Sequence, residues 1–276
     1  MQESSFISTS SNRRLTLKWK DGEATSFEDF VSIEEPIEVK VNGVSIAVIM
    51  RTPGSDFELA AGFIVTEGII DSIKQIGTIS YCDQAQEPNL KNVVDICLSK
   101  GIQIDQEKFK RNFYASSSCG ICGKASIEAI AKNIDKLDQS LAVDGNVLCG
   151  LPDTMRLQQA IFSHTGSLHA AALFNHRGTL IRLREDVGRH NAVDKLVGSY
   201  VIEGKNVPQK SIMLVSGRTS FEIIQKAASV GVELVAAVSG PSSLAIDLAK
   251  SLNMGLIGFL RPPTFNIYAG SERIIL

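Results

Sequence analysis

The 276-residue sequence lacks an excess of charge of either sign, and it is poor in aromatic residues and in cysteine. Its net charge of −2 gives no basic field, so we expect no binding to nucleic acid. No apolar run is long enough to cross a membrane, and the first ten residues lack the pattern of a secretory signal. We therefore expect a cytoplasmic protein that contacts no membrane. The apolar content of 44% is typical of a globular chain with a large buried core.

The five cysteines are an odd and sparse set, which does not predict a disulfide framework. Cys82 and Cys97 lie in strand-like runs, and Cys149 lies in a segment whose glycine and proline predict a loop. We expect these three thiols to have structural roles. Cys119 and Cys122 differ, because they stand in the polar, glycine-rich stretch SSSCGICGKAS. This pair is the candidate for thiol chemistry.

The first part of the chain predicts a small α+β domain. Asn42-Gly43 between two apolar runs is typical of a tight hairpin turn. Apolar residues at helical spacing predict a helix over residues 56–66, with Ser55 as its cap. Strands are expected over residues 15–19, 37–41, 44–50, 76–82 and 93–98. The polar run 107–118 is the best candidate for a boundary, which gives an N-terminal domain of residues 1–115 and a second domain of residues 116–276.

The second part of the chain alternates strands with helices, which predicts an α/β domain with parallel strand pairing. The runs IMLV, LVAAV and LIGFL are continuously apolar, as is typical of strands buried on both faces. Strands are expected over residues 169–174, 179–183, 212–215, 234–238 and 256–260. Helices are expected just after Cys122 and over residues 153–163, 191–202, 221–230 and 243–252.

Polar loops follow three of these apolar strands. Open α/β sheets bind ligands beyond the carboxyl ends of their strands. Hydroxyls and backbone N–H groups at helix starts bind anions, and arginine adds bidentate donors for phosphate. The candidate residues are Ser216, Gly217 and Arg218 after the first strand, Ser239 and Ser242 after the second, and Arg261 after the third. Each serine could simply cap a helix, but three adjacent ends, two with arginine, favour a phosphate-bearing ligand. The usual nucleotide motifs are absent.

The densest polar run is REDVGRHNAVDK, residues 184–195, which leaves a strand and enters a helix. Asp186, Arg189 and His190 are its candidate ligand-binding residues. The alternative is a capping loop whose charges are solvated. His169 opens an apolar strand, and we expect it to be a core histidine.

The Cys119 and Cys122 pair has three interpretations. Structural zinc needs four ligands, and a deaminase-type zinc site needs an upstream His-x-Glu; the sequence contains neither set, so we expect no structural zinc. A thioredoxin-like dithiol needs a buried strand before the pair, whereas a basic and serine-rich run precedes it. A sulfur carrier needs a reachable thiolate, which cations and a helix start favour. The residues around Cys119 and Cys122 favour a sulfur carrier and leave the interpretation as a redox dithiol open.

The sequence resembles the FdhD/NarQ family of formate dehydrogenase accessory proteins over nearly its whole length. The resemblance is carried by TPGSDFELAAGFIVTEGII, SSSCGICG, GSLHAAAL, EDVGRHNAVDK, SGRTSFEIIQKAA, SGPSSLAIDLA and GFLRPPTFNIY. Ser167 stands where we would expect a second glycine. The resemblance implies a cytidine deaminase-like three-layer α/β fold for the C-terminal domain, without the zinc chemistry of deaminases.

The resemblance also implies a function. A member of this family is a sulfurtransferase that receives sulfur from a cysteine desulfurase as a persulfide. It passes the sulfur to the molybdenum bis(molybdopterin guanine dinucleotide) cofactor of formate dehydrogenase, and GDP would be a partial mimic of that cofactor. Cys119 would be the persulfide carrier and Cys122 a second thiol; the apoenzyme would be a partner and the protein a homodimer. The implied cofactor-binding stretch is Phe259, Leu260, Arg261, Pro262, Pro263 and Thr264. The alternatives are a thiol–disulfide redox protein and a chaperone that shelters the cofactor without transferring sulfur.

Overall fold

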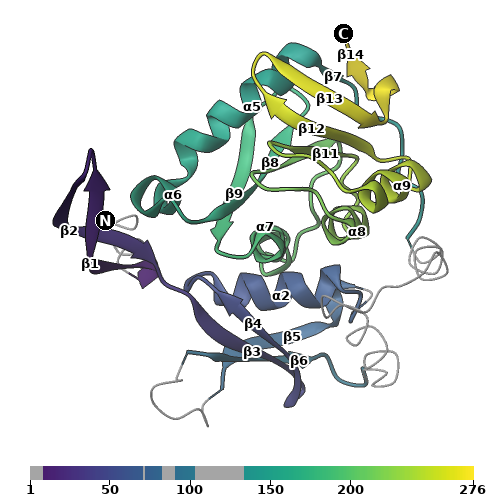
Figure 1. The fold of residues 1–276 in the computed structure, drawn as a ribbon. Coiled ribbons are helices and arrows are strands. Elements are labelled where there is room, and N and C mark those ends of the chain that lie inside the picture. The colour runs from purple at the N-terminus through teal and green to yellow at the C-terminus, as the bar shows by residue number, and fades with distance from the viewer. Residues whose placement is uncertain (1–8, 71, 83–90, 103–133) are drawn as a thin grey trace.

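The structure, a computed structural model, describes residues 9–70, 72–82, 91–102 and 134–276. Its described part forms two bodies, each built on its own sheet, and a hairpin that projects from them (Figure 1). The N-terminal elements are β1 (Ser11–Lys20), β2 (Glu23–Ser32), β3 (Glu35–Val41), β4 (Val44–Arg51), α2 (Asp56–Thr66), the 3-10 turn η1 (Ile73–Gln75), β5 (Ile76–Tyr81) and β6 (Val93–Leu98).

The C-terminal elements alternate as the sequence predicts, and the mixed α/β class is confirmed. They are β7 (Val143–Asp144), α5 (Gly145–Gln158), α6 (Ala160–Thr165), β8 (His169–Asn175), β9 (Leu180–Asp186), α7 (Arg189–Val201), β10 (Ser211–Val215), α8 (Phe221–Ser229), β11 (Leu234–Ala237), α9 (Ser243–Ser251), β12 (Gly255–Arg261), β13 (Thr264–Ala269), η2 (Ser271–Arg273) and β14 (Ile274–Ile275). The strands β2, β7, β13 and β14 were not expected from the sequence.

The six-stranded sheet has the order β13-β12-β11-β10-β8-β9. The pairs β10–β11 and β11–β12 are parallel, as predicted, whereas β8 is antiparallel to β10. Alternate residues of a strand face opposite sides of a sheet. In β10, Met213 and Val215 therefore pack with α7, α8 and α9, while Ile212 and Leu214 pack with α5. Helices cover both faces, which explains the continuous apolar runs of the central strands.

The smaller sheet has the order β4-β3-β6-β5, and α2 covers one of its faces (Figure 1). The hairpin at Asn42-Gly43 and the bounds of α2 are as predicted. On its other side α2 lies against α7, where Gly62 and Gly198 allow the two backbones to touch: a Cβ atom at either glycine would collide with a backbone carbonyl of the other helix. The crossing of α2 and α7 thereby joins the two sheets into one body.

Three local predictions were wrong. The segment containing Cys149 and Pro152 is part of α5 instead of a loop, and the helix expected over residues 153–163 is two helices that meet at Gln159. Leu148, Leu151 and Met155 are buried, so packing on the sheet outweighs the lost hydrogen bond of the proline. Ser55 has a left-handed conformation and its side chain does not cap α2, because a capping hydroxyl requires an extended backbone.

The boundary predicted near residue 115 and the helix predicted just after Cys122 lie outside the described residues. Within the described ranges, no helix combines the length and the apolar content that a membrane span requires.

Candidate functional site

The carboxyl ends of β10, β11 and β12 lie at one edge of the large sheet, because these strands are parallel neighbours. The loops that follow are bonded to one another. The backbone N–H of Ser242 donates to the carbonyl of Thr219 at 3.0 Å, and that of Phe259 donates to the carbonyl of Ser239 at 3.2 Å. The structure thus brings together the three polar segments that sequence reasoning selected. We call this edge, formed by residues 216–220, 238–242 and 258–261, the strand-end edge.

The start of β8 belongs to the strand-end edge as well, since β8 is antiparallel to β10. The Ser216 hydroxyl accepts a hydrogen bond from the backbone N–H of Ala170 at 2.9 Å, so it is engaged in holding these strands together. Gly217 lies against the ring of His169: a Cβ atom there would be 3.2 Å from Nδ1 and 3.9 Å from Cβ of Arg189. A larger residue at position 217 would fill the space in front of the imidazole.

His169 was expected in the core, but the structure places it half-buried at this edge. Burial lowers the pKa of His169, the charge of Arg189 lowers it further, and Arg218 adds a smaller effect in the same direction. The imidazole is therefore neutral at pH 7 beside two guanidinium groups. Sequence periodicity could not find this residue, because the antiparallel pairing of β8 decides its position.

Two buried polar atoms at the strand-end edge have no hydrogen-bond partner among the described residues: Nε of Arg189 and Oγ1 of Thr219. Buried polar groups are nearly always paired, so such atoms indicate a site that a ligand or water completes. Arg218 is exposed, and within the described part of the chain it forms no ion pair. Cationic groups without carboxylate partners are the kind of donors that suit anions.

His190 begins α7 beside the loop after β10. Its Nε2 lies 3.1 Å from the Ser220 hydroxyl and 3.8 Å from a carboxylate oxygen of Glu222. Burial, followed by the charge of Arg189, lowers the pKa of His190 to about 4. A neutral imidazole can accept a hydrogen bond from the Ser220 hydroxyl; Ser220 is the N-cap residue of α8, but its side chain makes no capping hydrogen bond. The contact between His190 and Ser220 links the start of α7 to the start of α8.

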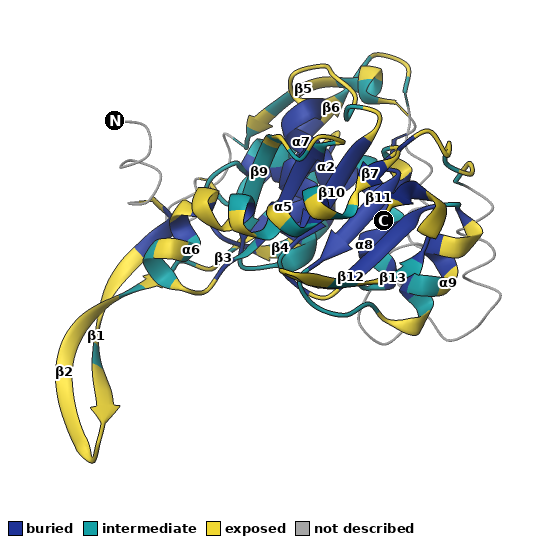
Figure 2. Ribbon diagram, turned by 90° about the horizontal axis from the view of Figure 1, so that it is seen from above, coloured by how far each residue is buried: buried dark blue, intermediate teal, exposed yellow. Residues whose placement is uncertain are grey.

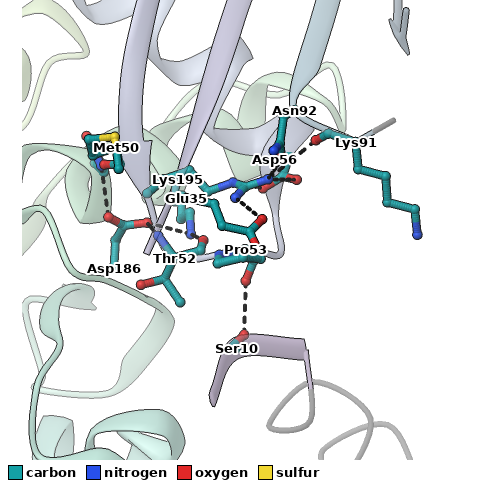
Figure 3. A network of polar contacts seen from close by, with 12 residues as sticks. Ser10, Glu35, Met50, Thr52, Pro53, Asp56, Lys91, Asn92, Asp186 and Lys195 are labelled. Atoms are coloured by element: carbon teal, nitrogen blue, oxygen red, sulfur yellow. Dashed lines mark hydrogen bonds and ion pairs between the residues drawn. The ribbon is translucent and has the colours of Figure 1, made fainter. Parts of the chain in front are cut away.

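Asp186 is the cross-strand partner of His169, but its side chain is fully buried and belongs to a network between the two bodies (Figure 3). Its carboxylate is 2.7 Å from Nζ of Lys195 and accepts hydrogen bonds from the backbone of Thr52 at 3.1 Å and from Asn191 at 2.8 Å. Lys195 also donates to the carbonyl of Thr52 at 2.8 Å. With every partner supplied by the protein, Asp186 and Lys195 tie α7 to the end of β4.

A second cluster of the same network includes Glu35 and Asp56 (Figure 3), whose carboxylates lie around the buried Arg51. Arg51 donates to both carboxylate oxygens of Asp56 at 3.0 and 3.1 Å and to Glu35 at 3.2 Å. The Tyr81 hydroxyl donates to Asp56 at 3.1 Å. This cluster fixes the start of α2 on the small sheet and is structural.

The expected cofactor-binding stretch forms the turn from β12 to β13. Arg261, Pro262, Pro263 and Thr264 are all exposed, and the Pro262–Pro263 peptide bond is cis. Arg261 donates from Nε to the carbonyl of Val238 at 3.3 Å, which leaves its terminal nitrogens toward solvent. Phe259 is 45% exposed, whereas Leu260 is fully buried and contributes to the core. A ligand here would meet Phe259, Arg261 and Thr264, but not the side chain of Leu260.

Cys119 and Cys122 lie outside the described residues. Among the residues that are described, no group of three or more His, Cys, Asp or Glu side chains is arranged to hold a metal ion.

The fold and this edge define an open α/β protein with cationic and polar groups gathered at its strand ends. Comparison with known proteins then identifies the chain: the FdhD/NarQ family profile matches residues 32–275, and the chain belongs to this family. It is 45% identical over 269 residues to the sulfur carrier protein FdhD of Streptomyces avermitilis, covering 96% of this chain and 95% of that protein. Identity to the protein of the same name from Mycobacterium tuberculosis is 43% over 252 residues, covering 88% and 91% of the two chains.

A solved structure shares the fold. It is a protein of Desulfotalea psychrophila described as a formate dehydrogenase accessory protein, with a TM-score of 0.76 and 24% identity, covering 96% of this chain and 100% of that one. At this identity the likeness concerns the fold alone.

Proposed function

We propose that this chain is a sulfur carrier for formate dehydrogenase maturation, the role that the name of its relatives describes. Sulfur would arrive from a cysteine desulfurase as a persulfide on Cys119 and leave to the molybdenum bis(molybdopterin guanine dinucleotide) cofactor before that cofactor enters the apoenzyme. We place this exchange in the cytoplasm. The single observation that supports the cofactor half of the proposal is the strand-end edge, where guanidinium groups and orphaned buried polar atoms converge.

The loading step requires no external electrons. The Cys119 thiolate attacks the outer sulfur of the donor persulfide, the donor's S–S bond breaks, and the donor cysteine leaves as a thiolate. Delivery as sulfide requires two electrons. A second thiol, Cys122 or an external one, attacks Sγ of Cys119, so that sulfide leaves and the two thiols are oxidised to a disulfide. A cellular thiol reductant then restores the dithiol.

The residues at the strand-end edge fit a ligand with several phosphates. Arg218 and Arg261 offer donors that no described carboxylate occupies, and Gly217 leaves the space beside His169 open. Thr219 and Arg189 each have a buried polar atom that an anion or its bound water can satisfy. Three adjacent loops give contacts over a length that a dinucleotide cofactor requires and that a single phosphate would not.

The proposed role as a sulfur carrier is tested by intact-mass measurement after incubation with a desulfurase and cysteine. We expect wild-type protein to gain one sulfur on the peptide that contains Cys119, and Cys119→Ala to gain none and to lose client activation. Cys122→Ala should be milder. Cofactor binding without a gain of sulfur would instead identify a sheltering chaperone, and an internal disulfide without a persulfide would identify a redox protein.

The proposed binding of the cofactor at the strand-end edge is tested by calorimetric titration with GDP. Each charge-assisted contact contributes about 1.5–3 kcal/mol, so Arg218→Ala or Arg261→Ala should weaken binding roughly ten- to a hundredfold. The matched control is Arg177→Ala, because Arg177 is exposed in the β8–β9 turn at the opposite edge of the same sheet. Equal affinity in all three folded variants would remove these arginines from the site.

A further inference from the structure

The imidazole of His169 lies in a cluster of charged groups at the strand-end edge. Three charged residues from three different elements act on it: Arg189 of α7, Asp186 of β9 and Arg218 of the loop after β10. Asp186 is its cross-strand partner, but the ammonium group of Lys195 lies 2.7 Å from that carboxylate and balances its charge. The two guanidinium groups are therefore the uncompensated charges around the imidazole.

The space beside the imidazole is kept open by Gly217. A Cβ atom at this glycine would be 3.2 Å from Nδ1 of His169 and 3.9 Å from the Cβ atom of Arg189, so the glycine lies against both residues. The strands β10 and β11 are buried along their length (Figure 2), and a ligand can reach only the loops that follow them. In one of these loops Thr219 is 1% exposed, and its hydroxyl has no hydrogen-bond partner among the described residues. A buried hydroxyl without a partner points to a ligand or water beside it.

The two histidines near this edge differ in their engagement. The ring of His190 is held by the Ser220 hydroxyl at 3.1 Å. His169 is half-buried, and within the described part of the chain its ring makes no hydrogen bond. Its nitrogens are therefore available to a ligand that enters the space beside Gly217.

We propose that His169 binds the phosphate of the ligand as an imidazolium ion, which takes up a proton from solvent when the anion enters. This inference rests on the proposed function, because the anion is a phosphate of the guanine dinucleotide cofactor or of its mimic GDP. In the free protein, burial and then the charges of Arg189 and Arg218 lower the pKa of His169, so the ring is neutral. A phosphate beside the guanidinium groups replaces their positive potential at the ring with a negative one, which favours the charged form.

The affinity for phosphate then depends on pH. Binding and protonation are linked, so the ligand binds more tightly as the pH falls toward the pKa that His169 has in the complex. Well above that pKa the ring is neutral in both states, and its charge contributes nothing. A nearby opposite charge raises the pKa of a histidine by about 1 or more, and each pKa unit corresponds to about a tenfold change in affinity. We therefore expect a gain of roughly tenfold in affinity from pH 8 to pH 6 that depends on His169.

The first test follows the proton NMR signals of the four histidine rings over pH, with and without GDP. The loss of one signal in His169→Gln assigns that of His169. We expect saturating GDP to raise the pKa of His169 by about 1 or more. The signal of His176 is the internal control and should not respond to GDP, because this residue is exposed in the β8–β9 turn at the opposite edge of the sheet. Without GDP, Arg189→Gln should also raise the pKa of His169, since it removes a nearby positive charge.

The second test is calorimetric titration of GDP at pH 6 and pH 8. The terminal phosphate of GDP itself gains a proton near about pH 6, so each result is compared with that of His169→Gln, in which this effect is the same. His176→Gln is the matched control and should behave as wild type. GDP binding with an unchanged pKa of His169, or the wild-type pH dependence in a folded His169→Gln protein, would overturn this inference alone. If GDP binds to wild type at neither pH, the proposed cofactor site is overturned as well.

Discussion

The crossing of α2 and α7 permits a sharp prediction about the contact that joins the two sheets. In Gly198→Ala, the new Cβ atom would collide with the backbone carbonyl of Glu58 and would lie 2.8 Å from the backbone nitrogen of Gly62. Neither atom can rotate away, since both belong to the backbone of α2. The helices would have to separate by more than 1 Å before the contact reached the 3.0 Å at which real Cβ contacts begin.

The magnitude follows from two opposing effects. Alanine gains about 1 kcal/mol over glycine in a helix interior, whereas overpacking a tight contact costs typically 1–3 kcal/mol and occasionally more. The collision here is between the new Cβ atom of α7 and the backbone of α2. Relieving it moves α2 away from the buried side chains of α7. We therefore expect a net loss of at least about 3 kcal/mol. For a chain of this size that corresponds to a fall in melting temperature of roughly 6–12 °C.

The matched control is Gly150→Ala in α5, where a new Cβ atom would meet nothing within 4 Å. This variant should gain up to about 1 kcal/mol from helix propensity, and its melting temperature should rise by a few degrees. Thermal melts and urea titrations of both variants give the comparison. A Gly198→Ala protein as stable as wild type would show that the two helices do not touch at their backbones, and the reasoning would fail.

Three further predictions concern buried charge. Asp194→Asn should lower the free energy of unfolding by about 1–3 kcal/mol in urea titrations, because buried Lys226 loses one carboxylate partner at 3.0 Å and keeps the other, Glu67, at 2.6 Å. Burial lowers the pKa of His190 to about 4, so the free energy of unfolding should decrease as the pH falls from 6.5 toward 4. This decrease should be smaller in His190→Gln. Burial and then Asp56 raise the pKa of Tyr81 to about 12, so absorbance titration should show ionisation at lower pH in Asp56→Asn.

Much of the fold could be read from local patterns. The apolar runs of β10, β11 and β12 predicted a parallel, doubly covered sheet, and the helical spacing of residues 56–66 predicted α2 with its bounds. The position of the polar loops followed from the same reasoning, because residues after parallel neighbouring strands must share an edge. The spacing of apolar residues and the residues that form turns are local properties, so a single sequence contains them.

Contacts between distant residues decided the rest. α5 continues through Pro152 because its apolar face packs on the sheet, and His169 reaches the strand-end edge because β8 runs antiparallel to β10. Asp186 looked like a ligand-binding residue, yet it is buried beside Lys195 and bonded to Thr52, which lies 134 positions earlier. The exposure of Leu15, Leu17 and Trp19 was equally hidden, since the same alternation would serve a strand packed on a core. Alternation states which residues share a face; only tertiary packing determines whether that face is covered.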